Sequence, residues 1–272
     1  MAKKKNWKKS VVTYLFYFIC AYGGLITYLY SGQRDMLYHP YGASPVPDAV
    51  SEVYAIDITK RGFSPKGWYI EAADPDKPTI LHFHGNGGNV ASRYDGLQHF
   101  IKDGYGLLLA EYSGYGGNTG APSEESIYQD AEAYYTYLKY IGLEESQIIL
   151  YGESLGSGPA TYLAQKYDAK ALVLEVPYDS ILNVVKERYW FVLGLKYLLK
   201  DQFNNIGRIA DINMPLLIML AGRDAVIPVE HGKALYEAAN TPKALRIHDY
   251  AGHNSLKREA VFNDVQEFLK QQ

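Results

Sequence analysis

The chain has 272 residues, of which 47% are hydrophobic and 21% charged, which suits one α/β domain and leaves little room for a second. The net charge of −3 hides an asymmetry, because five of the 27 Lys and Arg residues lie within the first nine positions. The rest of the chain has 22 Lys and Arg and 30 Asp and Glu, which gives a net charge of −8. Because it also has no basic run, nucleic acid is disfavoured as a partner. The single cysteine excludes an intramolecular disulfide and a Cys-based metal site.

The N-terminus predicts a membrane anchor. Residues 1–10 form a basic tail, and the apolar span over residues 11–30 is about the length that a helix needs to cross a bilayer. Lysines on the short N-terminal side of the span predict that this tail is cytoplasmic. The rest of the chain would then be periplasmic or extracellular in a bacterium and lumenal or extracellular in a eukaryote. The alternative is a cleaved signal peptide with its apolar core over residues 11–20, although the apolar run continues beyond it. We therefore expect a single-pass, signal-anchored protein.

A connector rich in Pro, Gly and Tyr is expected over residues 31–47, before one α/β domain over residues 48–272. An antiparallel pair of strands opens this domain, and short apolar runs then alternate with helical segments. The expected strands are 53–58, 67–72, 79–83, 106–111, 147–151, 171–176, 216–221 and 244–250. The expected helices are 89–102, 123–141, 155–167, 230–239 and 256–269. This order predicts an open, mostly parallel, doubly wound sheet with helices on both faces.

A glycine-rich loop, His-Gly-Asn-Gly-Gly-Asn over residues 84–89, directly follows an expected buried strand. Such a loop lets backbone N–H groups approach a ligand, and we expect Asn86 to supply an oxyanion donor. A P-loop is excluded, because no Gly-Lys-Ser/Thr follows. His82 and His84 point to one face of the strand and suggest a metal pair, but a third and fourth ligand are missing and no metal is expected.

The segment Tyr-Gly-Glu-Ser-Leu-Gly, residues 151–156, lies between an expected strand and an expected helix. Gly152 and Gly156 allow strand and helix to approach closely while Ser154 takes strained backbone angles that expose its hydroxyl. Because Ser154 would lie at a helix N-terminus, the Leu155 N–H is a natural oxyanion donor. The alternative is an ordinary strand-to-helix turn in which the serine only caps the helix.

Large apolar residues interrupt the strand and helix rhythm over residues 179–211. Ligands of open α/β sheets bind at the carboxyl ends of the strands, and an insertion there would cover the site. We interpret this segment as a small apolar helical lid, with ordinary core helices as the alternative.

Two polar residues follow later expected strands in the order that a catalytic triad requires. Asp224 comes just after the strand 216–221, and His253 lies in the loop before the last helix, so both fall on the edge where Ser154 points. We predict that His253 is the general base and Asp224 orients it, although Asp224 also suits an ordinary turn. Competing residues, at the wrong end of a strand, within a strand or at a helix start, are Asp211, Asp249, His248 and His231.

These motifs together resemble the α/β-hydrolase superfamily, in particular its small membrane-anchored branch, which includes protein depalmitoylases. Where that branch usually has Asp-Tyr-Arg-Gly-Tyr-Gly, this chain has Glu-Tyr-Ser-Gly-Tyr-Gly at residues 111–116. The resemblance spans nearly the whole chain, and the proteins that the chain resembles include esterases, thioesterases and lipases. The segments that carry it are residues 33–40, 84–89, 111–116, 120–124, 151–156, 222–224 and 252–253.

The sequence thus predicts a membrane-anchored serine hydrolase that cleaves ester or thioester bonds through an acyl-enzyme, without a metal or organic cofactor. The apolar lid and the nearby bilayer suggest lipid-like or acylated substrates. Two alternatives stay open: a catalytically silent α/β-hydrolase-fold binding protein, and a serine peptidase or amidase. Substrate contacts are expected at Gly85, Tyr112, Glu153, Tyr178 and Trp190.

Overall fold

The computed structural model describes residues 7–44, 54–57 and 66–272. Most of the expected cytoplasmic tail (1–6), the end of the connector (45–47) and the start of the expected domain (48–53) lie outside the described residues. The first expected strand is described only over residues 54–57.

An eight-stranded sheet forms the centre of the molecule, in the order β10-β9-β8-β7-β4-β6-β3-β2. The six strands from β10 to β6 are parallel, whereas β3 is antiparallel to both of its neighbours. This confirms the mostly parallel sheet and the antiparallel pair that opens it. The strands are β2 (Tyr54–Asp57), β3 (Lys66–Ile70), β4 (Thr79–Phe83), β6 (Gly106–Ala110), β7 (Ile148–Glu153), β8 (Ala171–Glu175), β9 (Leu216–Ala221) and β10 (Lys243–His248).

Helices cover both faces of the sheet. Successive residues of a buried strand point to opposite faces, so each strand contributes side chains to two cores. In β4, Leu81 packs into a core with α4, α5 and α8, whereas Ile80 packs into a second core with α2, α3 and α9. The first group is α4 (Glu124–Tyr140), α5 (Ser157–Lys166) and α8 (Val229–Ala238), and the second is α2 (Val90–Tyr94), α3 (Gln98–Lys102) and α9 (Arg258–Leu269). Short 3₁₀ turns are η1 (Asp95–Leu97), η2 (Glu145–Gln147) and η3 (Ser154–Gly156).

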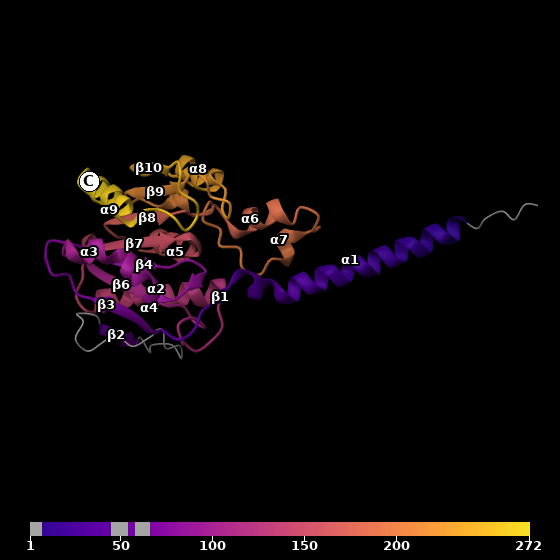
Figure 1. The fold of residues 1–272 in the computed structure, drawn as a ribbon, viewed down its shortest axis with the longest axis horizontal. Coiled ribbons are helices and arrows are strands. Elements are labelled where there is room, and N and C mark those ends of the chain that lie inside the picture. The colour runs from indigo at the N-terminus through magenta and orange to yellow at the C-terminus, as the bar shows by residue number, and fades with distance from the viewer. Residues whose placement is uncertain (1–6, 45–53, 58–65) are drawn as a thin grey trace, which may run out of the picture.

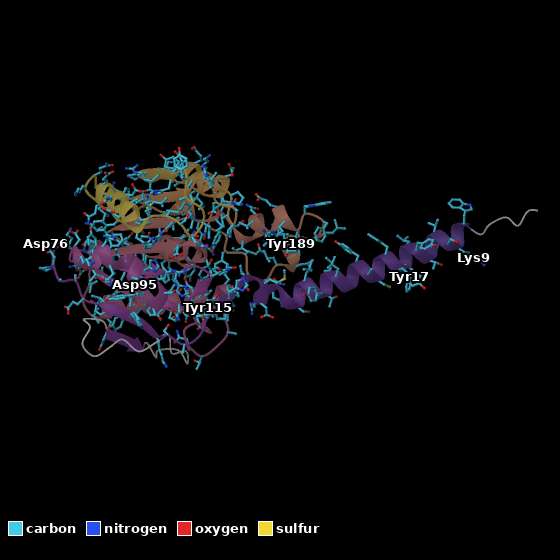
Figure 2. The ribbon with its side chains drawn as sticks, in the orientation of Figure 1. Lys9, Tyr17, Asp76, Asp95, Tyr115 and Tyr189 are labelled. Atoms are coloured by element: carbon cyan, nitrogen blue, oxygen red, sulfur yellow. The ribbon has the colours of Figure 1, made fainter. Side chains whose placement is uncertain are left out.

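The N-terminal helix α1 (Trp7–Leu37) projects from the domain as a single rod (Figure 1). Its segment Lys9–Leu37 contains an 18-residue window with a mean hydropathy of 1.6, none of it buried, and is a candidate membrane span by length and composition. Figure 2 shows the outer part of the helix, with Lys9 and Tyr17 labelled, extending away from the other elements. The helix continues to Leu37, so residues 31–37 are helical where the sequence predicted a connector.

The insertion between β8 and β9 forms two short helices, α6 (Ile181–Arg188) and α7 (Leu195–Leu198), and ends in the 3₁₀ turn η4 (Ile209–Asp211). Figure 1 shows α6 and α7 beside the part of α1 that is closest to the domain. After α1, the chain forms a small parallel pair between β1 (His39–Pro40) and β5 (Gly87–Gly88), which joins it to the glycine-rich loop.

Candidate active site

Ser154 directly follows β7 and has a φ of 51°, in the left-handed region that side chains usually avoid. A Cβ added to Gly156 would lie 2.0 Å from the carbonyl oxygen of Phe83, and one added to Gly152 would lie 2.5 Å from that of Gly156. Both positions therefore require glycine, as the sequence predicted. Strand and helix meet so closely that the turn between them has to be sharp, and this turn holds Ser154 in its strained conformation.

Three side chains from the ends of different strands form one hydrogen-bonded chain. The Oγ atom of Ser154 lies 2.9 Å from Nε2 of His253, and Nδ1 of the same ring lies 2.6 Å from Oδ2 of Asp224. The Asp224 side chain is 3% exposed and that of His253 is 11% exposed, so bulk water screens this pair only weakly. The structure thus brings together the three residues that the sequence singled out.

Asp224 is held as a carboxylate by donors on both of its oxygens. The backbone N–H groups of Val226 and Ile227 each donate to Oδ1 over 2.8 Å. Burial alone would raise the pKa of Asp224, but the hydrogen bond from His253 and these two amides outweigh burial and lower it. An ionised Asp224 accepts a hydrogen bond from the N–H at Nδ1, which leaves Nε2 of His253 unprotonated and able to accept the proton of Ser154.

The glycine-rich loop lies against Ser154 and is tied to the end of α1. A Cβ on Gly85 would come within 3.5 Å of the Ser154 Cβ, which places this loop beside the serine. The Asn86 side chain donates to the Leu37 carbonyl over 2.9 Å, and the Asn86 carbonyl accepts from the backbone N–H of His39 over 3.2 Å. The loop that carries Asn86 is therefore fixed by the last residue of α1 and by the chain just beyond it.

Glu111 connects this loop to the body of the domain, a role that the sequence analysis did not foresee. It is fully buried and accepts hydrogen bonds from His84 Nε2 at 2.9 Å, from the Val90 N–H at 3.0 Å and from the Ser44 hydroxyl at 2.8 Å. A Cβ on Gly116 would lie only 2.1 Å from the Glu111 carboxylate. One signal in the sequence pointed to this residue: Glu111 opens the segment Glu-Tyr-Ser where the similar proteins usually have Asp-Tyr-Arg.

His82 of β4 and His84, which directly follows the strand, are used for packing and hydrogen bonding. His84 makes hydrogen bonds through both ring nitrogens, to Glu111 and to the Gly85 carbonyl. His82 is buried, and burial together with the nearby Arg93 lowers its pKa well below the usual value, which keeps the ring neutral. Within residues 7–44, 54–57 and 66–272, no group of three His, Cys, Asp or Glu side chains is arranged to hold a metal ion.

A polar cavity of about 280 Å³ lies beside His253, and Glu153 faces into it. Glu153 pairs with Arg93 over 3.0 Å, and burial raises the pKa of the Glu153 carboxyl. Glu175, at the end of β8, binds Arg258 on the same wall over 2.5 Å. The cavity thus offers paired charges next to the base.

An apolar cavity of about 480 Å³ lies between α1 and the lid. Leu29, Met36 and Leu37 of α1 form one wall, and the residues that directly follow Asp224 close its inner end. Its volume falls within the roughly 300–1,000 Å³ that is typical of small-molecule sites. The residues opposite α1 are Val184, Val185, Tyr189, Val192, Leu195 and Leu198.

The other three residues expected to contact substrate, Tyr112, Tyr178 and Trp190, lie outside both cavities. Tyr112 and Tyr178 are fully buried, and their hydroxyls donate to the carbonyls of His84 and Leu155 over 2.6 and 3.0 Å. These two side chains support the glycine-rich loop and the turn at Ser154 from within the core, and they do not line either cavity. Trp190 is 81% exposed at the far end of the lid and lies outside both cavities as well.

A second His–Asp pair joins the root of the lid to the domain. His231, which was expected at a helix start, is buried, and its Nδ1 lies 2.8 Å from Asp179. Asp179 also accepts from the Asn183 side chain of α6 over 2.8 Å. No local pattern could have paired these residues, because they are separated by 52 positions.

Comparisons with known proteins agree with this architecture. Residues 78–201 match the family model described as alpha/beta hydrolase fold. The chain is 34% identical over 256 residues to an uncharacterized protein of Mycobacterium tuberculosis, and the match covers 90% of each protein. It is 32% identical over 221 residues to alpha/beta hydrolase domain-containing protein 17B of Homo sapiens, covering 78% of this chain and 72% of that protein.

Among solved structures, the Pyrococcus furiosus esterase Pf2001 is similar in fold. It superposes with a TM-score of 0.67 at 21% identity, over 86% of this chain and 98% of the esterase. The sheet order, the elbow after β7 and these relatives all point to one conclusion: the chain belongs to the α/β-hydrolase superfamily and is a hydrolase.

Proposed function

We propose that the protein is a membrane-anchored serine hydrolase that cleaves carboxylic ester or thioester bonds, with Ser154 as nucleophile, His253 as general base and Asp224 as the group that orients it. The observation that carries this proposal is the continuous hydrogen-bonded chain from Ser154 Oγ through His253 to Asp224. A serine hydroxyl is a weak nucleophile at neutral pH, and this arrangement supplies the base that it needs.

The reaction proceeds in two steps. His253 takes the Ser154 proton through Nε2 as Oγ attacks the carbonyl carbon, and it then gives this proton to the departing alcohol or thiol. A water molecule, deprotonated by the same nitrogen, attacks the acyl-enzyme and releases the acid. The backbone N–H groups of Leu155 and Asn86 stabilise the oxyanion, and one such donor contributes about 2.7–4 kcal/mol.

The two cavities motivate the choice of substrate. The apolar cavity between α1 and the lid suits an acyl chain, and the polar cavity beside His253 suits a polar leaving group. Glu153 lines the polar cavity and Gly85 lies beside Ser154, which supports substrate contacts at these two residues. We therefore favour esters or thioesters with an acyl chain over peptides.

A fluorophosphonate probe tests the nucleophile directly. The full chain in detergent should take up the label at Ser154, whereas Ser154→Ala should take up none and lose ester hydrolysis. Ser157→Ala is a matched control, because Ser157 lies three residues along the same turn and its hydroxyl donates to the Ser154 carbonyl. Folded protein that stays unlabelled would contradict the proposal.

Anchoring belongs to the same proposal. Residues 11–30 of α1 cross the bilayer, residues 1–10 stay in the cytoplasm, and the hydrolase domain of residues 48–272 lies on the opposite side. The hydropathy of α1 and the five lysines before the span support this orientation.

Cysteine accessibility tests the orientation. Tyr140 is 77% exposed at the end of α4, so Tyr140→Cys in a Cys20→Ser background places one thiol on the domain surface. In intact cells, a membrane-impermeant maleimide added outside the membrane that carries the protein should label this thiol. Labelling that appears only when the membrane that carries the protein is opened, together with labelling of a cytoplasmic marker protein, would show that the domain faces the cytoplasm.

A further inference from the structure

The lid touches α1 well inside the apolar part of the helix. We define the lid tip as residues 189–198, between the end of α6 and the end of α7. The Tyr22 hydroxyl donates to the Phe191 carbonyl over 3.1 Å and accepts from the Leu193 N–H over 2.8 Å. Because an α-helix rises 1.5 Å per residue, Tyr22 lies about 12 Å further along the axis than Tyr30, where the apolar span ends.

The lid tip exposes large apolar side chains where it meets the helix. Trp190 is 81% exposed, Leu193 is 77% exposed and Tyr197 is 88% exposed. Such a cluster of exposed apolar groups is unusual for a surface that faces water. Trp and Tyr are the residues that favour the boundary between headgroups and acyl chains.

Polar contacts hold the base of the lid tip at the end of the span. The Gln33 side chain donates to the Leu198 carbonyl over 3.2 Å and accepts from the Lys200 N–H over 2.7 Å. Arg34 forms a two-pronged ion pair with Asp201 at 2.8 and 3.1 Å. These polar groups lie about three helical turns closer to the domain than the Tyr22 contact, which matches the step from hydrocarbon to headgroup and water.

We propose that the lid tip is embedded in the bilayer, in the same leaflet as the domain-proximal end of α1, and contacts lipid through Trp190, Leu193 and Tyr197. This inference rests on the anchoring in the proposed function. The lid is then a second membrane-contact element. Since the apolar cavity lies between lid and α1, its mouth opens at the leaflet, and a membrane-resident acyl chain reaches it without passing through water.

Single cysteines report the depth of each element. Cys20 is the single cysteine of the chain and is exposed on α1, so the wild-type protein carries a probe for the anchor. Leu193→Cys and Tyr140→Cys, each in a Cys20→Ser background, carry probes at the lid tip and on the domain surface. Tyr140 is the last residue of α4, and the chain from there leads to the start of β7, whereas Ser154 follows the end of β7. Tyr140 therefore lies on the opposite side of the domain from Ser154 and is the aqueous control.

Each thiol is labelled with the environment-sensitive fluorophore NBD, and the protein is reconstituted into phosphatidylcholine and phosphatidylglycerol vesicles. We expect the Leu193 probe to resemble the Cys20 probe, with blue-shifted emission and an iodide quenching constant several-fold smaller than at Tyr140. A Leu193 probe as accessible as the one at Tyr140, beside a protected Cys20 probe, overturns the lid inference and leaves the anchor intact. Equal quenching at all three positions overturns the anchoring itself.

Discussion

Asp224 performs two tasks with its two carboxylate oxygens. Oδ1 accepts from the turn amides of Val226 and Ile227, which fixes the carboxylate, and Oδ2 accepts from His253, which fixes the ring. At the scale of a single residue, an acid becomes an orienting group because its neighbours immobilise it. An ordinary turn aspartate would make only the first set of bonds.

Asp224→Asn should therefore keep the fold and lose activity. The amide preserves the size of the side chain but can donate to Nδ1, which favours the imidazole tautomer that cannot accept the Ser154 proton, and we expect kcat to fall about 10⁴-fold. Hydrolysis of a soluble short-chain ester and the melting temperature in detergent provide the measurement.

Asp211→Asn is the matched control for this variant. Asp211 precedes β9, at the other end of the same strand, and its carboxylate accepts from the exposed side chain of Gln165 over 2.9 Å. Its kcat should match that of the wild type. An Asp224→Asn enzyme that retains most of its activity would show that another group orients His253.

At the scale of elements, the lid depends on the buried pair between His231 of α8 and Asp179 at its root. The hydrogen bond with Asp179 raises the pKa of His231 despite partial burial. Burial opposes the change at Asp179, but hydrogen bonds from His231 and Asn183 outweigh it and lower the pKa of Asp179. Glu187 also faces the ring, 3.3 Å from Nε2, and adds to the shift of His231.

These directions set the pH window in which the pair stabilises the fold. The contribution of His231 is complete below its ordinary pKa of about 6.5 and is lost as pH rises through the raised pKa of the folded state. The contribution of Asp179 is complete above its ordinary pKa of about 3.9 and is lost as pH falls through the lowered one. Both contributions are present together between about pH 4 and pH 6.5.

His231→Gln should accordingly destabilise the protein most in that window. Removing one partner of a buried hydrogen-bonded pair costs about 1–3 kcal/mol, and the gap in stability to the wild type should narrow as the pH rises from about 6.5 through the raised pKa of His231. Melting temperatures of both proteins across this range provide the measurement. The exposed His39→Gln is the comparison, and a pH-independent gap for His231→Gln would contradict the assigned pair.

At the scale of the whole molecule, the N-terminal helix α1 contributes to the candidate site. The Leu37 carbonyl accepts from the Asn86 side chain, and β1 pairs with β5 immediately beyond the helix. The loop that supplies the proposed second oxyanion donor is thus held by residues whose sequence pattern shows only a membrane anchor and its connector.

Two truncations separate anchoring from positioning. Removal of residues 1–20 leaves every contact of Leu37 and His39, so hydrolysis of a soluble short-chain ester should be unchanged. Removal of residues 1–39 takes away both contacts, and kcat/KM for the same ester should fall at least about tenfold, towards the 10²–10³ expected for loss of an oxyanion donor. Near-UV circular dichroism checks that both proteins are folded. Equal activity of both proteins would limit α1 to a tether.

The sequence alone was sufficient to predict the strands of the large sheet, most of the helices that cover it, and their order. The period of apolar residues depends on neighbours a few positions away, so the buried strands, the antiparallel opening pair and the glycines around Ser154 could be identified locally. The parallel topology follows from the alternation of strands and helices, and it predicts that Ser154, Asp224 and His253 share one edge.

Only the tertiary structure decided which residues face the cavities and what holds the loops. Tyr112 and Tyr178 were expected to contact substrate, yet their hydroxyls bond to backbone carbonyls in the core. The contacts between Tyr22 and the lid tip join residues about 170 positions apart. Local sequence encodes conformation and burial pattern, whereas partners across the fold depend on how packed elements meet in space. The chemistry proposed at Ser154 could therefore be predicted from the sequence, whereas the joining of α1, lid and glycine-rich loop around it could not.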